Sequence, residues 1–262
     1  NKTIDPEGNI TQIEYDSLGN IEKVIEKQAN REYKYTYDAA NNLESEINPL
    51  GEKTTYIYNA NNLLSIEVNS LGNKTVYKYN PLNLISEVIN SVGDVTKYQY
   101  DKNQNLEAVT DGNNNKTTYL YDELNRLEKV TNPLGNETTY TYDKSSNLTS
   151  VKDGNGNSTN YTYDKVGKLT SVTNSLGEVE EFDYNPIGTL ASYTKPDGTA
   201  INYDYDILNR LVETEYTDKD GKNLDEKSII YKYDVIGNRI SMEGEEGETK
   251  YGYDKVGRLE KV

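Results

Sequence analysis

The chain has 262 residues, with 25 tyrosines, one phenylalanine, one methionine and no tryptophan, cysteine or histidine. The absence of cysteine excludes disulfides and thiol chemistry, and the absence of histidine removes the commonest general base and metal ligand. A formal charge of −16 disfavours nucleic acid and anionic membranes as partners, and no stretch has the pattern of a signal peptide or of an apolar segment for membrane insertion.

A motif of the form Tyr-x-Tyr-Asp/Asn recurs along the whole chain. Before the regular series, Tyr15 lies 22 residues ahead of the first member. The second aromatic of the motif then recurs every 21 residues, at Tyr37, Tyr58, Tyr79, Tyr100, Tyr121, Tyr142, Tyr163, Tyr184 and Tyr205. Tyr233 follows after 28 residues and Tyr253 after 20. This period indicates a single array of about twelve repeats over residues 1–262, which starts and stops within a repeat.

Each repeat has the pattern of two β-strands. In the repeat that begins at Thr138, residues 138–143 alternate threonine and tyrosine before an aspartate, and residues 147–151 form a second short β-type segment. No segment has a sustained 3.6-residue apolar period, so no helices are predicted. The predicted fold is all-β, one long antiparallel sheet of about 24 strands that is twisted or spiralling, because sheets do not stay flat.

The first turn of each repeat follows the tyrosine motif, and we expect a two-residue hairpin loop there. The expected loop dipeptides are Gly19-Asn20, Asn125-Arg126, Gly167-Lys168, Asn209-Arg210 and Gly257-Arg258. Counting outward from these loops predicts the pairs Leu18 with Ile21, Leu124 with Leu127, Val166 with Leu169, Ile187 with Leu190, Leu208 with Leu211, Tyr121 with Val130, Tyr163 with Val172 and Tyr253 with Val262. Tyrosine and valine would then share one face. The repeats of Tyr58 and Tyr79 have one residue fewer before the leucine, which predicts a bulge or a different loop.

The second turn contains a recurrent glycine. It lies seven residues before the motif tyrosine at Gly51, Gly72, Gly93, Gly135, Gly156, Gly177 and Gly198, with Asn114 in the same position once and Gly247 in the corresponding place before Tyr253. This pattern predicts a three-residue loop with a left-handed residue at its centre. The 28-residue step holds residues 217–223, which we interpret as a longer loop inserted at a turn.

Residues 161–177 read Tyr-Thr-Tyr-Asp-Lys-Val-Gly-Lys-Leu-Thr-Ser-Val-Thr-Asn-Ser-Leu-Gly. This pattern, repeated through the chain, resembles the YD-repeat or Rhs-repeat family, which includes bacterial polymorphic toxins, wall-associated proteins, insecticidal toxin complexes and the teneurins. The resemblance implies a long sheet that spirals into a hollow shell, in a secreted or cell-surface bacterial protein. Its partners would be a cargo toxin domain or further repeats of the same polypeptide.

The resemblance implies a non-catalytic segment that encapsulates or displays a toxin or effector domain. The alternative is an adhesin-like module that binds carbohydrate or protein through its tyrosine-rich face, because aromatic faces stack on sugar rings. A shell predicts tyrosines packed against valine and neighbouring strands, whereas a binding module predicts a solvent-exposed tyrosine face. A cell-surface glycan therefore stays a possible partner, whereas nucleic acid binding and membrane insertion are not expected.

Two segments superficially resemble calcium loops, residues 111–115 and 153–157, which present oxygen ligands at alternate positions. Both lack a closing glutamate and lie on the second turn, so turn formation is the preferred interpretation. The aspartate after the motif tyrosine recurs in most repeats, and we expect it to bond the backbone of the adjacent turn. No catalytic, cofactor-binding or metal-binding residues are predicted, and no cofactor is expected.

Overall fold

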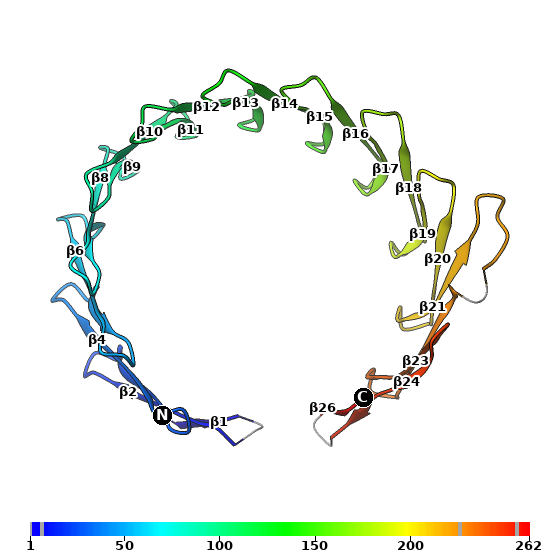
Figure 1. Ribbon diagram of the computed structural model, residues 1–262, viewed down its shortest axis with the longest axis horizontal. Helices are drawn as coiled ribbons and strands as arrows, with labels where there is room; N and C mark the ends of the chain where they lie inside the picture. The colour runs from blue at the N-terminus through cyan, green and yellow to red at the C-terminus, as the bar shows by residue number, and fades with distance from the viewer. Residues whose placement is uncertain (1, 6–7, 225–226, 255–256) are drawn as a thin grey trace. The chain divides into compact units, whose positions relative to one another are not determined.

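The computed structural model describes residues 2–5, 8–224, 227–254 and 257–262, and all of its regular elements are β-strands (Figure 1). The chain divides into two compact units, Asn1–Gly135 and Asn136–Val262. Strands β1–β24 are assigned to a 24-stranded antiparallel sheet, and β25 and β26 form a separate pair. The all-β fold built from two-strand repeats is therefore confirmed.

Each motif contributes one strand that ends at its second tyrosine and a second strand that starts after the first turn. The strands of the first unit are β1 Lys2–Ile4, β2 Ile10–Tyr15, β3 Ile21–Glu26, β4 Arg31–Tyr37, β5 Leu43–Ile47, β6 Lys53–Tyr58, β7 Leu64–Val68, β8 Lys74–Tyr79, β9 Ile85–Ile89, β10 Val95–Tyr100, β11 Leu106–Thr110, β12 Lys116–Tyr121 and β13 Leu127–Thr131. The strands of the second unit are β14 Glu137–Tyr142, β15 Leu148–Lys152, β16 Ser158–Tyr163, β17 Leu169–Thr173, β18 Val179–Tyr184, β19 Leu190–Thr194, β20 Ala200–Tyr205, β21 Leu211–Thr217, β22 Ile229–Tyr233, β23 Arg239–Gly244, β24 Gly247–Lys250, β25 Gly252–Tyr253 and β26 Leu259–Lys261.

The predicted register of the first hairpin is wrong by two residues. In β12 and β13 it is Tyr119, the first aromatic of the motif, that pairs with Val130, whereas Tyr121 pairs with Leu127. The same register places Tyr163 opposite Leu169 and Tyr253 opposite Leu259. The predicted leucine pairs across the first turn do not form, because Leu124 lies in the loop and is exposed. Tyrosine and valine nevertheless share one face, as predicted.

The register differs because the first turn is longer than two residues and is followed by a bulge. The Asp122 N–H donates to the Arg126 carbonyl, and the Asn125 N–H donates to the Asp122 carbonyl, which encloses a three-residue loop. Asn125 ends this loop in a left-handed conformation, with φ of 60°. The pairing then shifts between Leu120 and Tyr121, so that one residue of β13 has no opposite partner.

The second turn has the same construction as the first. In the β5–β6 turn, the Asn48 N–H donates to the Glu52 carbonyl and the Gly51 N–H donates to the Asn48 carbonyl, which confirms a three-residue loop. The left-handed residue is the third of the loop and not its centre, and Gly51 has φ of 80°. Asn114 takes the same place with φ of 67°. The last turn of this series differs, because Gly244 pairs directly with Gly247.

Two irregular places in the sequence have different outcomes. The repeats of Tyr58 and Tyr79 use the ordinary first turn, with Asn62 and Asn83 left-handed. Of the two expectations for these repeats, a bulge is confirmed, because the pairing shifts beside Tyr58 and beside Tyr79, whereas a different loop does not form. The expectation of a longer loop after β21 is confirmed. β21 continues to Thr217, which bridges to Asn223, and a further three-residue turn closes between Asp218 and Lys222.

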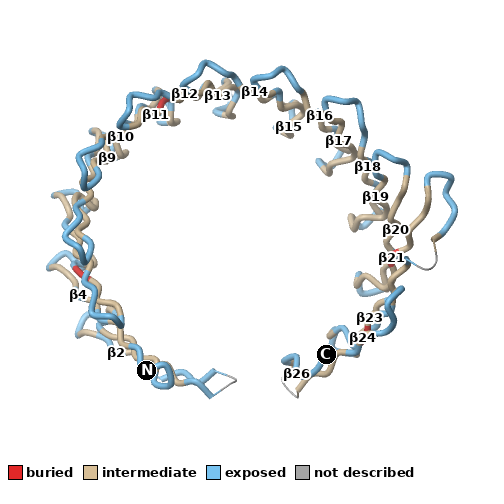
Figure 2. The backbone as a smooth tube through the Cα atoms, viewed as in Figure 1, coloured by how far each residue is buried: buried red, intermediate tan, exposed pale blue. Residues whose placement is uncertain are grey.

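The sheet is a single layer over the described residues. The accessible surface is 17460 Å², whereas a compact protein of this mass exposes roughly 11,600 Å². Among the described residues only Ala108, Ser45, Thr214 and Ser241 are buried (Figure 2). Each hairpin is therefore stabilised by its two neighbours and not by a central core.

The second turn gives a direct test through Gly177, which has φ of 81° and no heavy atom within 4 Å of a hypothetical Cβ. Space is free there, so a substitution is limited by backbone conformation alone. We expect Gly177→Val to cost on the order of 1–3 kcal/mol in unfolding free energy, and Gly177→Asn to cost less because Asn114 occupies this position naturally. Urea unfolding measures both, with Glu178→Val as the control. Equal stability of Gly177→Val and Glu178→Val would contradict the turn.

Candidate functional site

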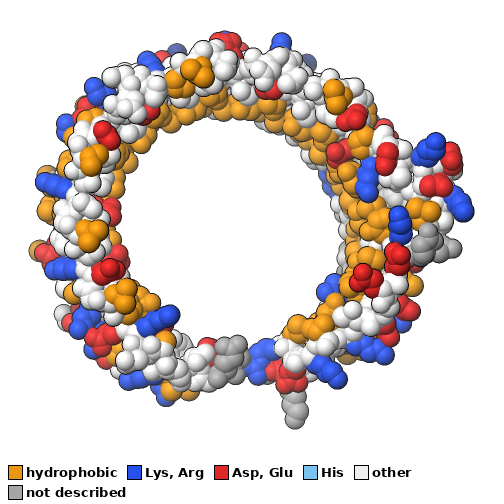
Figure 3. Space-filling view, in the orientation of Figure 1, with side chains coloured by type: hydrophobic (Ala, Val, Ile, Leu, Met, Phe, Trp, Pro, Cys, Tyr) orange, Lys and Arg blue, Asp and Glu red, His pale blue; other side chains and the backbone are white. Residues whose placement is uncertain are grey.

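The tyrosine face of the sheet is the candidate functional surface. We define it as the face that carries both aromatics of each motif and the residue opposite the first of them, which in β12–β13 are Tyr119, Tyr121 and Val130. The opposite face carries residues such as Lys78 and Glu87, which form an ion pair at 2.7 Å. Within each unit the sheet bends, and hydrophobic side chains gather along the concave side of the bend (Figure 3). The two faces therefore differ in polarity.

Cross-strand pairs cover this face. The first aromatic of the motif lies opposite valine in five hairpins: Tyr77 with Val88, Tyr98 with Val109, Tyr119 with Val130, Tyr140 with Val151 and Tyr161 with Val172. In the β18–β19 hairpin, Phe182 and Tyr193 replace them and stack with ring centroids 5.2 Å apart. Such pairs stabilise a sheet locally, and these tyrosines are half-buried as the shell interpretation predicts.

The second tyrosine of the motif joins one repeat to the one before it. β7 and β8 pair only over Ile66–Val68 and Lys74–Val76, so the strands separate beyond this point. The Tyr79 hydroxyl crosses this gap and donates to the Leu64 carbonyl at 2.6 Å. Equivalent bonds of 2.8–3.0 Å run from Tyr37 to Ile21, Tyr58 to Leu43, Tyr100 to Ile85, Tyr163 to Leu148, Tyr233 to Leu211 and Tyr253 to Arg239. We call this series the tyrosine ladder.

Two glutamates on the tyrosine face accept further tyrosine hydroxyls. Glu46 and Glu67 stand where later repeats have valine, and they accept from Tyr56 at 2.9 Å and from Tyr77 at 3.2 Å. Burial, followed by the hydrogen bond to Glu46, raises the pKa of Tyr56 to about 12. Both carboxylates therefore belong to the packing of neighbouring hairpins.

The aspartate after the motif tyrosine bonds the turn, as predicted. Asp122 Oδ1 accepts the N–H groups of Leu124 at 2.9 Å and Arg126 at 3.0 Å, and Asp122 Oδ2 accepts Arg126 Nε at 2.7 Å. These bonds, the Arg126 N–H first, hold the pKa of Asp122 below its ordinary value. Asn59 bonds its own turn with the same geometry through Oδ1. The recurrent carboxylate therefore closes a loop.

The two calcium-like segments are also turns. Asp153 Oδ1 accepts the N–H groups of Asn155 and Asn157, and Asp153 Oδ2 accepts the Asn157 amide at 3.0 Å. Asp111 makes the equivalent bonds to Asn113 and Asn115. The described part of the chain contains no group of three or more acidic side chains placed to hold a metal ion.

Among the described residues there is no helix long and apolar enough to cross a membrane.

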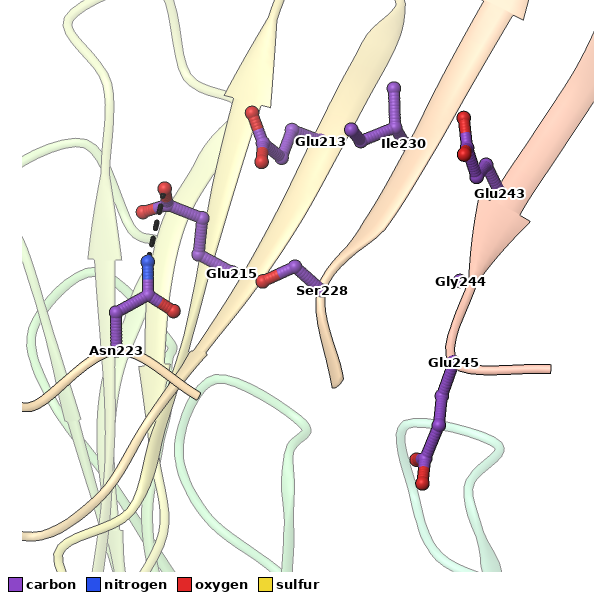
Figure 4. Close-up of a pocket in the computed structure, with 8 residues that line it drawn as sticks. All are labelled: Glu213, Glu215, Asn223, Ser228, Ile230, Glu243, Gly244 and Glu245. Carbon is purple, nitrogen blue, oxygen red and sulfur yellow. Dashed lines mark hydrogen bonds between the residues drawn. The ribbon is translucent and has the colours of Figure 1, made fainter. Parts of the chain in front are cut away.

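The repeat with the long loop has an open acidic pocket of about 450 Å³ beside that loop (Figure 4). It is lined by Glu213, Glu215, Asn223, Ser228, Ile230, Glu243, Gly244 and Glu245. The Asn223 amide donates to Glu215 at 3.5 Å, and Lys232 lies 4.0 Å from Glu243. Acidic side chains alone do not define a ligand, so we assign no function to this pocket.

Family and structure comparisons agree with this geometry. The RHS repeat family matches residues 37–74, 100–137, 121–157, 142–179 and 184–222, which together make up more than half of the sequence. The chain belongs to the RHS repeat family. Among curated proteins, no relative matches it.

Solved structures of Tc toxin proteins share the fold. The RHS chain is similar to a chain in a crystal structure of TcdB2–TccC3, with a TM-score of 0.67, 16% identity, and coverage of 98% of this chain and 16% of that chain. It is also similar to a chain of the Photorhabdus luminescens Tc holotoxin pore, with a TM-score of 0.57, 17% identity, and coverage of 98% and 17%. TcdB2–TccC3 without its hypervariable C-terminal region gives 0.57 at 16% identity, with coverage of 98% and 17%. The RHS chain thus spans about one sixth of each matched chain.

The tyrosine ladder was not predicted from the sequence. The regular spacing of the second tyrosine showed that this residue serves every repeat, but the wrong register hid its acceptor. A three-residue first turn would have placed the second tyrosine opposite the first aliphatic residue of the next strand. Its acceptor, however, is a backbone carbonyl of the preceding repeat, which no residue type in the sequence marks.

The β16–β17 repeat offers a matched test of the ladder. Tyr163 donates to the Leu148 carbonyl at 2.8 Å, whereas Tyr161 makes no hydroxyl hydrogen bond within the described chain. We expect Tyr163→Phe to lower the free energy of unfolding by about 1–2 kcal/mol, because it leaves a half-buried carbonyl without a donor. Tyr161→Phe is the control and should change stability little. Urea unfolding that shows equal losses for both variants would contradict the ladder.

The turn aspartates predict an acid-dependent loss of stability. Because the folded-state pKa of Asp122 is lowered, its contribution is present above the unfolded-state pKa of about 3.9 and is lost as pH falls through the folded-state pKa. Asp122→Asn keeps the acceptor oxygen but cannot titrate. We therefore expect this variant to lose less stability than the wild type between about pH 7 and about pH 3, as urea midpoints would show. Identical pH dependence would exclude the proposed role.

Proposed function

We propose that this chain is a non-catalytic wall segment of an RHS β-shell that encapsulates or displays a toxin or effector domain of a secreted or cell-surface bacterial protein. The observation that carries this proposal is the single-layer sheet in which both tyrosines of each motif serve contacts between strands. The first tyrosine packs against valine, and the second bonds the preceding repeat. The recurrent tyrosines and aspartates are therefore used in contacts that hold the sheet together, and we assign them no catalytic role.

The different polarity of the two faces supports the same proposal. A wall around a space needs one face for solvent and one face for what it encloses, and the Lys78–Glu87 ion pair lies on the face opposite the tyrosines. Similarity to TcdB2–TccC3, a component of a toxin complex, supports a polypeptide cargo. Further RHS repeats of the same polypeptide would supply the rest of the wall, because the matched chains are about six times longer.

The carbohydrate-binding alternative is less consistent with the geometry. A glycan platform needs aromatic faces open to solvent with free polar groups around them, whereas the ladder tyrosines are half-buried. Their hydroxyls are already donated to backbone carbonyls. We therefore assign the tyrosine face to the wall.

Small-angle X-ray scattering together with glycan titration tests this function. A single-layer bent wall predicts a radius of gyration well above about 18 Å, which is the value for a compact chain of this length, and a thin cross-section. It also predicts no saturable heat on titration with cell-wall polysaccharide. A compact particle would contradict the wall, and saturable glycan binding would establish the adhesin function instead.

A further inference from the structure

A row of exposed apolar side chains follows the first-turn edge of the second unit. Its members lie in four successive turns, those of β16–β17, β18–β19, β20–β21 and β22–β23. Ile207 is 97% exposed and Val235 is 99% exposed, and the others lie between 66% and 78%. We call this row the apolar edge, and it consists of Val166, Ile187, Ile207, Leu208, Val235 and Ile236.

The turn itself does not require these side chains. The same turn closes in β10–β11 with Lys102 and Asn103, and in β14–β15 with Lys144 and Ser145, at the positions that Ile207 and Leu208 occupy. The hydrogen bonds of the loop are equivalent in all three cases. The closure of this turn therefore does not need the apolar residues, and exposed apolar side chains gathered along one edge are typical of a surface that contacts another molecule.

Side chains hold neighbouring turns of the apolar edge together. Lys168 Nζ donates to the Gly188 carbonyl of the next turn at 2.6 Å and lies 4.9 Å from the Tyr184 ring centre. Arg210 Nη1 donates to the Asp234 carbonyl at 3.1 Å and lies 4.7 Å from the Tyr233 ring centre. Successive first turns are two strands apart, or about 10 Å. The row is thus a preformed series of apolar groups at a regular spacing.

We propose that the apolar edge is a self-association surface, through which a second copy of this chain packs edge to edge about a two-fold axis. A partner must present apolar groups at the same spacing of about 10 Å, and a second copy does so because its own row has that period. Side chains of one row can then lie between those of the other. A membrane surface fits poorly, because the chain carries a formal charge of −16.

The size of the row sets the strength of this contact. Complete burial of one such side chain removes roughly 60–120 Å² from water, so six would bury roughly 400–700 Å² on each copy, compared with about 800 Å² per partner in a stable interface. The association should therefore be reversible and concentration-dependent. The like charge of the two copies opposes it, so added salt should strengthen it by screening that repulsion.

Sedimentation velocity on the chain at increasing protein and salt concentration tests the proposal. We expect a shift from monomer toward dimer that grows with both. The variant Ile207→Lys/Val235→Lys should weaken the association by about tenfold or more, although it makes the net charge less negative and so reduces repulsion. Lys102 and Lys144 occupy the equivalent loop position, so the fold should tolerate the change, and an unaltered urea midpoint verifies this.

The control changes apolar residues at the opposite edge. Leu50→Asn/Leu71→Asn replaces two second-turn leucines, each 83% exposed, with the residue that Asn113 provides in the equivalent turn. This variant should associate as the wild type does. A wild type that stays monomeric at all concentrations, a lysine variant that associates undiminished, or a loss of association in the control instead would each overturn the proposal.

Discussion

The hydrogen bond that each tyrosine of the ladder, such as Tyr79, donates to a backbone carbonyl of the preceding repeat is the interaction on which the wall depends. Within a hairpin, backbone hydrogen bonds between the two strands continue as far as the turn. Between hairpins they stop after three residue pairs, as in β7–β8. Tyr79 occupies the gap that remains and satisfies the Leu64 carbonyl. One side chain thus fills space, supplies a missing donor and fixes the distance between repeats.

This arrangement explains how a chain with so little buried surface remains ordered. Each hairpin contacts only its neighbours, so stability accumulates from local terms repeated along the chain. The aspartate or asparagine that closes the first turn sets where each strand begins, and side chains tie one turn to the next, as Asn103 Nδ2 does to Asn125 Oδ1 at 2.8 Å. The tyrosines and the aspartate or asparagine of the motif thus recur because each hairpin needs the same contacts with its neighbours.

The architecture could be derived from the sequence, whereas the register of the hairpins could not. The 21-residue period, the alternation of tyrosine and threonine, and the glycines of the second turn establish two strands per repeat. The length of the first turn does not follow from the sequence, because Gly167 and Asn125 suit a two-residue loop as well as the third position of a longer one. Two features of the folded hairpin select the longer loop. The Asp122 carboxylate accepts backbone N–H groups of the turn, and a bulge follows Leu127 in the next strand.

The candidate surface was predictable in its chemistry but not in its bonding. Tyrosine with valine on one face follows from parity, because a shift of two residues leaves the faces unchanged. The acceptor of each ladder tyrosine lies 14–22 residues earlier in the sequence. It can be any residue type, since Leu64, Ile85 and Arg239 all accept through their backbone carbonyls. Sequence patterns carry no signal for such a backbone acceptor.

Alkaline titration of the tyrosines, followed by ultraviolet absorbance alongside circular dichroism, tests the ladder most directly. Burial raises the pKa of Tyr58, Tyr79, Tyr100 and Tyr163. A raised folded-state pKa means that their contribution to stability is complete below the unfolded-state pKa of about 10 and is lost as pH rises through the folded-state value. We predict that one class of tyrosines ionises at a higher pH than the exposed tyrosines, and that the β-sheet signal in circular dichroism is lost as this class ionises. A single class near pH 10, with the sheet intact after ionisation, would contradict the ladder.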